Sequence, residues 1–152
     1  MRVVIALRGK PNSGKTTTIR RWVYDKLRTP ENEIRPNKLK KEDFGILEID
    51  GVKVGFCSVG DESSRLTGYL EWLVKAECLV IVCACRSIQN KKRLSSTAKV
   101  VDGMSRREPP YSIVWREKEQ GLTDKEGGNR DMSDGIIADI GCAVTIAKRH
   151  AA

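Results

Sequence analysis

Hydrophobic positions along the chain fall into short continuous runs and longer stretches with helical spacing. The runs predict strands at residues 3–7, 44–49, 52–59, 78–85 and 111–115. The runs 3–7 and 78–85 contain no polar residue, which is typical of strands buried on both faces of a parallel sheet. The runs 44–49 and 52–59 are joined by Asp50-Gly51, which favours a tight hairpin turn and therefore two antiparallel strands.

Helical spacing appears between these runs. The apolar positions that share a predicted helix face are Ile19, Trp22, Val23 and Leu27, then Leu66, Tyr69, Leu70, Leu73 and Val74, then Val100, Val101 and Met104, and finally Ile136, Ile137, Ile140, Val144 and Ala147. We expect Pro30 to close the first helix, Ser63 or Ser64 to cap the second, and Ser133 or Asp134 to cap the last. The polar segments 29–43 and 117–131 are predicted to be loops.

Strands that alternate with helices predict an α/β fold. The expected architecture is a three-layer sandwich, with a mostly parallel sheet that includes one antiparallel hairpin strand. The length of 152 residues is typical of one domain, so residues 1–152 are taken as a single domain.

One motif points to a specific chemistry. Residues 9–16 read GKPNSGKT and satisfy the pattern GxxxxGK[ST], directly after a predicted strand and at the start of a predicted helix. In this setting the backbone N–H groups of the loop can wrap phosphate groups, and Gly14 lets the backbone approach them closely. Lys15 is then expected to reach the β- and γ-phosphates, and the Thr16 hydroxyl to ligate Mg²⁺.

The strand, loop and helix of residues 2–28 resemble those of the P-loop nucleoside triphosphatase superfamily. The resemblance implies a P-loop NTPase fold, with Mg²⁺ and ATP or another nucleoside triphosphate as ligands. It implies that the nucleotide is bound by Gly9, Lys10, Pro11, Asn12, Ser13, Gly14, Lys15, Thr16 and Thr17.

Members of that superfamily carry a metal-holding acid at the end of a second strand. Here the apolar run that ends at Val59 is followed by Gly60-Asp61-Glu62, so Asp61 is the candidate second metal residue beside Thr16. Glu62 is a candidate general base for an attacking water, or alternatively an acidic first-turn residue favoured by the helix dipole. Arg86 follows a buried strand and is either a phosphate clamp or an ordinary surface charge.

The order of P-loop, helix, polar loop, hairpin and strand-end acid is also similar to that of small GTPases. Neither a DxxG sequence around residues 58–62 nor an Asn-Lys-x-Asp motif after the last strand is present, since that strand continues as WREKE. The missing guanine motif favours ATP over GTP.

The net charge of +8 and the pI near 9.4 suggest an anionic ligand or partner. Lys and Arg are concentrated in residues 20–41 and 86–107, which are candidate surfaces for nucleic acid or an acidic protein, or are simply solvated. The five cysteines lack CxxC spacing and lie mostly in apolar runs, so buried free thiols are expected rather than a metal site. We expect a cytoplasmic protein with no membrane span.

Two function classes follow from these features. The first is an enzyme that transfers the γ-phosphoryl group to water, as an ATPase or hydrolase, or to a small anionic acceptor, as a kinase; Lys15, Asp61, Glu62 and Arg86 are its candidate catalytic residues. The second is a nucleotide-controlled binding module that engages nucleic acid or a protein through its basic surface, alone or as an oligomer. A P-loop that has lost its function is a third alternative, against which the intact Lys15 and Thr16 argue.

Overall fold

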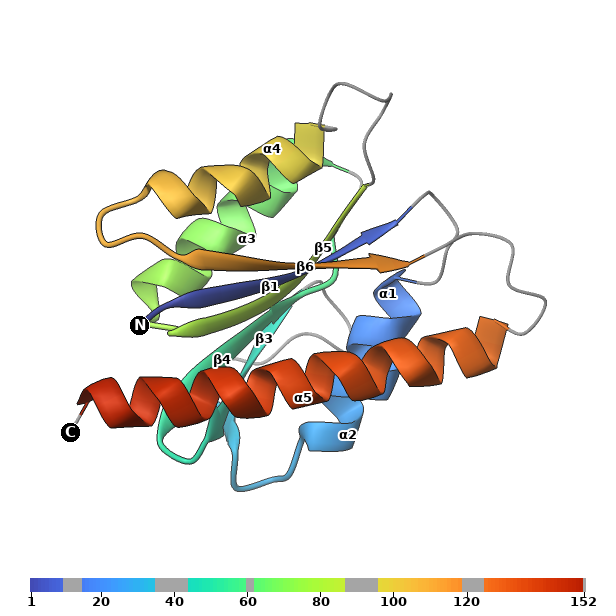
Figure 1. The fold of residues 1–152 in the computed structure, drawn as a ribbon, viewed down its shortest axis with the longest axis horizontal. Helices are drawn as coiled ribbons and strands as arrows, with labels where there is room; N and C mark the ends of the chain where they lie inside the picture. The colour runs from blue at the N-terminus through green and yellow to red at the C-terminus, as the bar shows by residue number, and fades with distance from the viewer. Residues whose placement is uncertain (10–14, 35–43, 60–61, 87–95, 119–124, 152) are drawn as a thin grey trace.

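The strands of the sheet are β1 (Val3–Gly9), β2 (Glu33–Ile34), β3 (Phe44–Ile49), β4 (Val52–Cys57), β5 (Val80–Arg86) and β6 (Ser112–Lys118). The helical segments are α1 (Lys15–Thr17), the π-helical η1 (Thr18–Tyr24), α2 (Asp25–Leu27), α3 (Ser63–Lys75), α4 (Ser96–Gly103), the 3₁₀ turn η2 (Met104–Arg106) and α5 (Lys125–Ala151). They come from a computed structural model that describes residues 1–9, 15–34, 44–59, 62–86, 96–118 and 125–151 (Figure 1).

The sheet has six strands in the order β2-β3-β4-β5-β1-β6. The pairs β4-β5, β5-β1 and β1-β6 are parallel, whereas β3 is antiparallel to both β2 and β4. Within the described sheet, β3 is therefore the strand that runs against all the others. The hairpin turn between β3 and β4 has positive φ angles at Asp50 (51°) and Gly51 (80°), as the Asp-Gly pair predicted.

Helices cover both faces of the sheet, and each face has its own hydrophobic core (Figure 1). On one face Ile19 and Val23 of η1 and Ile136 and Ile140 of α5 pack on the sheet. On the other face α3, α4 and η2 do so, through buried residues that include Leu66, Leu70, Leu73, Val101 and Met104. The predicted α/β fold with a covered, mostly parallel sheet is confirmed.

The helix after β1 is continuous but changes its winding. Its middle part, η1, is a π-helix, in which the N–H of Asp25 donates to the carbonyl of Arg20. Ile19 and Val23 are buried as predicted, whereas Leu27 is only half-buried. Tyr24, which the helical spacing did not include, is buried and packs its ring edge-on against Phe56 at 5.2 Å. The wider π turn explains why the residues facing the core differ from those of a regular α-helix.

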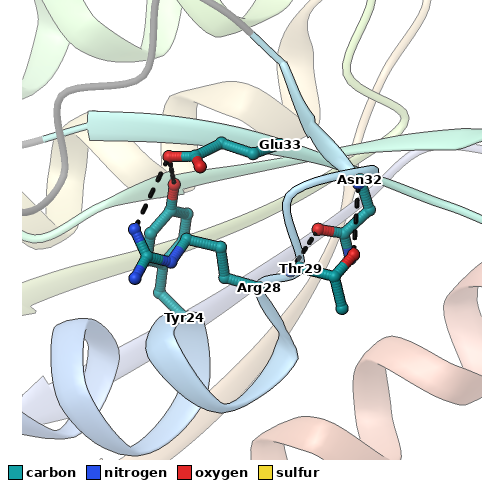
Figure 2. A network of polar contacts seen from close by, with 5 residues as sticks. All are labelled: Tyr24, Arg28, Thr29, Asn32 and Glu33. Carbon is teal, nitrogen blue, oxygen red and sulfur yellow. Dashed lines mark hydrogen bonds and ion pairs between the residues drawn. The ribbon is translucent and has the colours of Figure 1, made fainter.

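A small polar motif follows α2, where a featureless loop was predicted (Figure 2). The Thr29 N–H donates to Asn32 Oδ1 at 2.7 Å, and the Asn32 N–H donates to Thr29 Oγ1 at 3.2 Å. Asn32 Nδ2 also donates to the carbonyl of Leu27, which is one of the last carbonyls of the helix. The chain thereby turns into β2, so the prediction of no ordered element was wrong at residues 33–34.

Glu33 ties β2 back to the same helix. Its Oε1 accepts a hydrogen bond from Tyr24 Oη at 3.3 Å and lies 3.8 Å from Arg28 Nη1 (Figure 2). Burial, and then the neighbouring Glu33 carboxylate, raise the pKa of Tyr24 above its ordinary value, so the phenol stays protonated.

Two predicted helix starts were wrong. The N-cap of α3 is Glu62, and Ser63 is already the first helical residue. The last helix begins at Lys125, well before Ser133 and Asp134, although residues 117–131 were predicted to be a loop. Once a packed helix exists, each added residue gains a backbone hydrogen bond, and this outweighs a cost of about 1 kcal/mol for each glycine in that stretch.

The cysteine prediction is confirmed for four of the five thiols. Cys57, Cys78, Cys83 and Cys85 are buried and free, and Cys142 is free but exposed. No cluster of His, Cys, Asp and Glu suited to a metal ion occurs among the described residues. In the same part of the chain, none of the helices has the length and apolar character needed to cross a membrane.

Candidate functional site

The candidate site lies at the edge of the sheet where the parallel strands end. β1 ends at Gly9, and the register pairs Gly9 with Arg86 on β5 and with Lys118 on β6. β4 reaches the same edge, since Cys57 pairs with Cys83 and Ser58 follows it. Ligands of open α/β sheets bind outside this edge, because the connecting loops open there.

Lys15 and Thr16 are held over this edge by the start of the helix that follows β1. Lys15 Nζ donates to the Gly9 carbonyl at 2.7 Å, so the ammonium group folds back over the end of β1. Thr16 Oγ1 donates to the Ser58 carbonyl at 3.3 Å, which links α1 to the end of β4. The Lys15 ammonium group therefore lies at the end of β1, and the Thr16 hydroxyl group lies at the end of β4, two strands away in the sheet.

The predicted phosphate loop is described at its two ends. Gly9 is the last residue of β1, and Lys15, Thr16 and Thr17 form α1. The other predicted cradle residues, Lys10, Pro11, Asn12, Ser13 and Gly14, lie outside the described residues, and so does the candidate metal residue Asp61.

Glu62 has local contacts at the start of α3. Its carbonyl accepts the N–H of Leu66 at 3.1 Å, and its Oε1 accepts a hydrogen bond from Ser64 Oγ at 3.0 Å. The side chain is exposed. Glu62 is the N-cap residue of α3 by position, but its side chain makes no capping hydrogen bond to the helix N–H groups, and both alternatives for Glu62 stay predictions.

Arg86 lies beside the phosphate-loop strand. It pairs in register with Gly9, and its backbone N–H donates to Thr97 Oγ1 at 2.9 Å. Thr97 is buried at the start of α4, so this bond fixes the end of β5 against that helix. The Arg86 side chain is exposed at the edge where a phosphate group would bind, which keeps the clamp hypothesis open.

Ser58 is a site residue that the sequence patterns missed. It follows β4 directly, is 2% exposed, and its Oγ has no hydrogen-bond partner in the described part of the chain. It is the single hydroxyl residue in the otherwise apolar run 54–59, and this break in the pattern was the available signal. The acidic residue predicted after this strand, Asp61, comes three residues later in the sequence.

A second group of side chains that the sequence did not predict lies at the same edge, on the face of the sheet that α3 and α4 cover. The Arg8 guanidinium stacks on the Trp115 ring, 4.6 Å from its centroid, and Arg8 Nη2 lies 3.1 Å from Glu117 Oε2. Burial raises the pKa of the neighbouring Cys85 thiol to about 12, while the positive charges of Arg8 and Lys15 oppose this shift. At neutral pH this thiol is therefore protonated, and Cys85 contributes packing rather than nucleophilic chemistry.

The chemistry available at the edge is recognition of an anion and of a hard cation. Lys15 supplies a positive charge, and Thr16 supplies a hydroxyl oxygen of the kind that Mg²⁺ accepts together with several waters. The Ser58 carbonyl accepts a hydrogen bond from Thr16 Oγ1, and the buried Ser58 Oγ has no hydrogen-bond partner among the described residues. The residues present fit a magnesium ion accompanied by a phosphate ligand.

Comparisons with known proteins give no independent assignment. No family model matches the chain, and neither the curated proteins nor the solved structures contain a match. The residues at this edge of the sheet are therefore the basis for assigning a function.

Proposed function

We propose that this protein binds a magnesium complex of a nucleoside triphosphate, with ATP as the favoured nucleotide, and catalyses its hydrolysis or the transfer of its γ-phosphoryl group. One observation carries the proposal. Lys15 Nζ lies 2.7 Å from the carbonyl of Gly9, and Thr16 follows at the start of the helix, within the motif GKPNSGKT. The P-loop NTPase fold is part of the same proposal.

Lys15 is the residue expected to bind the phosphates. Its ammonium group has a backbone carbonyl as a hydrogen-bond partner, and an ammonium group donates up to three hydrogen bonds. In the nucleotide complex it would donate to β- and γ-phosphate oxygens. Charge that develops on the transferred group is then neutralised by a cation already held in position, which is the main requirement of phosphoryl transfer.

Thr16 is the residue expected to hold the metal. Bound Mg²⁺ would neutralise phosphate charge, which is the chemistry that the ion supplies in such sites. Thr16 is oriented by its hydrogen bond to Ser58, and this bond uses its hydroxyl proton and leaves the oxygen lone pairs available. Asp61 remains the proposed acidic residue near the metal.

The binding-module alternative has less support. Arg106 is paired with Asp102 at 2.9 Å, and Arg107 forms an ion pair with Glu71. Two arginines of the basic segment 86–107 are thus neutralised within the chain, and Lys91, Lys92 and Arg93 lie outside the described residues. A salt-dependent complex with nucleic acid at low ionic strength would favour this alternative.

The proposal is tested by thermal unfolding of the wild-type protein and Lys15→Ala with Mg-ATP, Mg-GTP, the diphosphates and no ligand. A ligand at about 100 times its Kd stabilises a protein by about 2.7 kcal/mol, which raises Tm by several degrees. We expect this increase with Mg-ATP in the wild type and its loss in Lys15→Ala. Lys26→Ala is the matched control, because Lys26 is an exposed lysine of the same helical segment, paired with Asp134 at 3.7 Å.

Phosphate release then separates the two reactions. Release from ATP without an acceptor indicates a hydrolase. Binding without release is expected both of a kinase that lacks its acceptor and of the nucleotide-controlled binding module, and a screen of acceptors and nucleic acid separates these two. An unchanged Tm of the wild type with every nucleotide would contradict the proposal.

A further inference from the structure

Ser58 is a buried hydroxyl residue whose burial the fold alone does not explain. The residue is 2% exposed, and its Oγ makes no hydrogen bond to any described residue. A buried hydroxyl without a partner loses its bonds to water and gains nothing in return. Costs of this kind persist mainly where function requires the group.

Ser58 faces the side of the sheet on which Thr16 lies. Along β4 and its continuation, Val54 and Phe56 belong to the core beneath η1, whereas Cys57 and Val59 belong to the opposite core. Side chains alternate between the two faces of an extended strand, so Ser58 continues the row of Val54 and Phe56. The Ser58 carbonyl accepts a hydrogen bond from Thr16 Oγ1, and the two oxygen atoms are 3.3 Å apart.

Ser58 directly follows β4 and carries no charge, whereas the predicted strand-end acid, Asp61, comes three residues later. A hydroxyl can both donate and accept a hydrogen bond, so it can bind a metal-coordinated water or a phosphate oxygen without adding a negative charge. Magnesium keeps several of its waters in protein sites, and these waters need acceptors around them.

We infer that the Ser58 hydroxyl positions the magnesium ion of the bound nucleotide, by holding a metal-bound water next to Thr16. Ser58 is then a positioning residue, which acts through that water and not on the reacting phosphate. Because this inference rests on the proposed function, its test separates metal affinity from nucleotide binding.

The test compares the wild type, Ser58→Ala and Cys57→Ala by thermal unfolding, first without ligand and then with ATP over a range of Mg²⁺ concentrations. Without ligand, Ser58→Ala should have a Tm equal to or above that of the wild type, because it removes an unpartnered buried hydroxyl. With ATP, the Mg²⁺ concentration that gives half of the Tm increase should rise about tenfold, as expected for the loss of one hydrogen bond. The Tm change that ATP causes in EDTA should be the same in Ser58→Ala as in the wild type.

Cys57→Ala is the matched control, since Cys57 is the buried neighbour on the opposite face of the same strand. Its Mg²⁺ midpoint should equal that of the wild type, whatever its Tm. Ser58→Cys keeps nearly the same volume with a poor hydrogen-bonding group, and it replaces Ser58→Ala if that variant does not fold.

The outcomes are distinct. A wild type that nucleotide does not stabilise contradicts the proposed function itself. A wild type that Mg-ATP stabilises, together with an unchanged Mg²⁺ midpoint in Ser58→Ala, overturns the role of Ser58 and leaves the proposed function standing. A lower Tm of Ser58→Ala without ligand would likewise overturn it, by showing that the hydroxyl has a structural partner in the folded protein.

Discussion

At the scale of single residues, several arginines that look like unpaired surface charges in the sequence have specific partners. Arg116 of β6 forms two parallel bonds with Asp139 of α5, from Nε to Oδ2 at 2.7 Å and from Nη2 to Oδ1 at 2.9 Å. Nη2 also lies 3.4 Å from the carbonyl of Gly135. The hydrogen bonds to Asp139 raise the pKa of Arg116 further above its ordinary value. This pair fixes α5 to the sheet edge next to the candidate site.

We expect Asp139→Asn to lower the free energy of unfolding by about 1 kcal/mol. Hydrogen bonds to charged groups contribute about 1.5–3 kcal/mol, and solvent reduces this contribution because the two side chains are 36% and 21% exposed. Urea unfolding at neutral pH measures the change. Asp102→Asn is the control, since it removes an exposed i,i+4 pair with Arg106 and should cost less than about 0.5 kcal/mol. Equal effects of the two changes would contradict the special role of Arg116 and Asp139.

The sequence predicted individual site residues to different extents. Lys15 and Thr16 were predicted because the spacing of the glycine motif carries its own physical reason. Ser58 was not, because a single serine in an apolar run has no pattern. Its significance comes from the Thr16 hydroxyl 42 residues away in the sequence, which only folding brings to it.

At the scale of elements, the contact between α3 and β4 depends on one glycine. A Cβ atom built on Gly55 would lie 2.7 Å from Leu73 Cδ2 and 3.1 Å from Cys78 Sγ. Both neighbours are buried, so neither has free space into which to move. β4 ends at Cys57, directly before Ser58, so this close approach also sets the distance of α3 from the strand that supports the candidate site.

We expect Gly55→Ala to lower the free energy of unfolding by about 1–3 kcal/mol, as overpacked cores do. Gly68→Ala provides a control of opposite sign. Gly68 is an exposed glycine inside α3 with open space around its Cα, so alanine there should stabilise the protein by about 0.5–1 kcal/mol. Urea unfolding of both variants measures these changes. A stabilising Gly55→Ala would contradict the tight contact.

The sequence predicted the elements well where burial repeats along them and poorly at their ends. The continuous runs of β1 and β5 and the apolar stripe of α3 leave little choice of structure. The start of α5 at Lys125 has no such pattern, because a polar, glycine-containing turn extends a helix whose later residues pack on the sheet. β2 depends on the reciprocal bonds of Thr29 and Asn32, which hydrophobic spacing does not encode.

At the scale of the whole molecule, the core on the α3 and α4 face contains four buried thiols, Cys57, Cys78, Cys83 and Cys85. Burial raises the pKa of Cys78 to about 12, although the positive charge of Lys53 opposes this shift, and it raises the pKa of Cys85 to about 12 as well. Burial also raises the pKa of Cys83 well above its ordinary value of 9.0. The folded protein therefore holds Cys78, Cys83 and Cys85 as neutral thiols under conditions in which the unfolded chain would ionise them.

We expect stability to fall as the pH rises above about 9. Below pH 9 these thiols are protonated in both states, so their contribution is fully present and does not depend on pH. Between pH 9 and about 12 the unfolded chain loses thiol protons that the folded chain keeps, and each thiol then lowers the free energy of unfolding by up to about 1.4 kcal/mol per pH unit. Urea unfolding from pH 7.5 to pH 10 measures this slope, to which the phenols Tyr24 and Tyr111, whose pKa values are also raised above 10.0, add as the pH approaches 10. Replacing both Cys78 and Cys85 by alanine should flatten the slope while Cys142→Ser should not, because Cys142 is exposed in the folded chain. The dependence of stability on pH is compared, and not the stability itself, because core substitutions change the stability at every pH. A wild type whose stability stays constant up to pH 10 would contradict the predicted thiol ionisation.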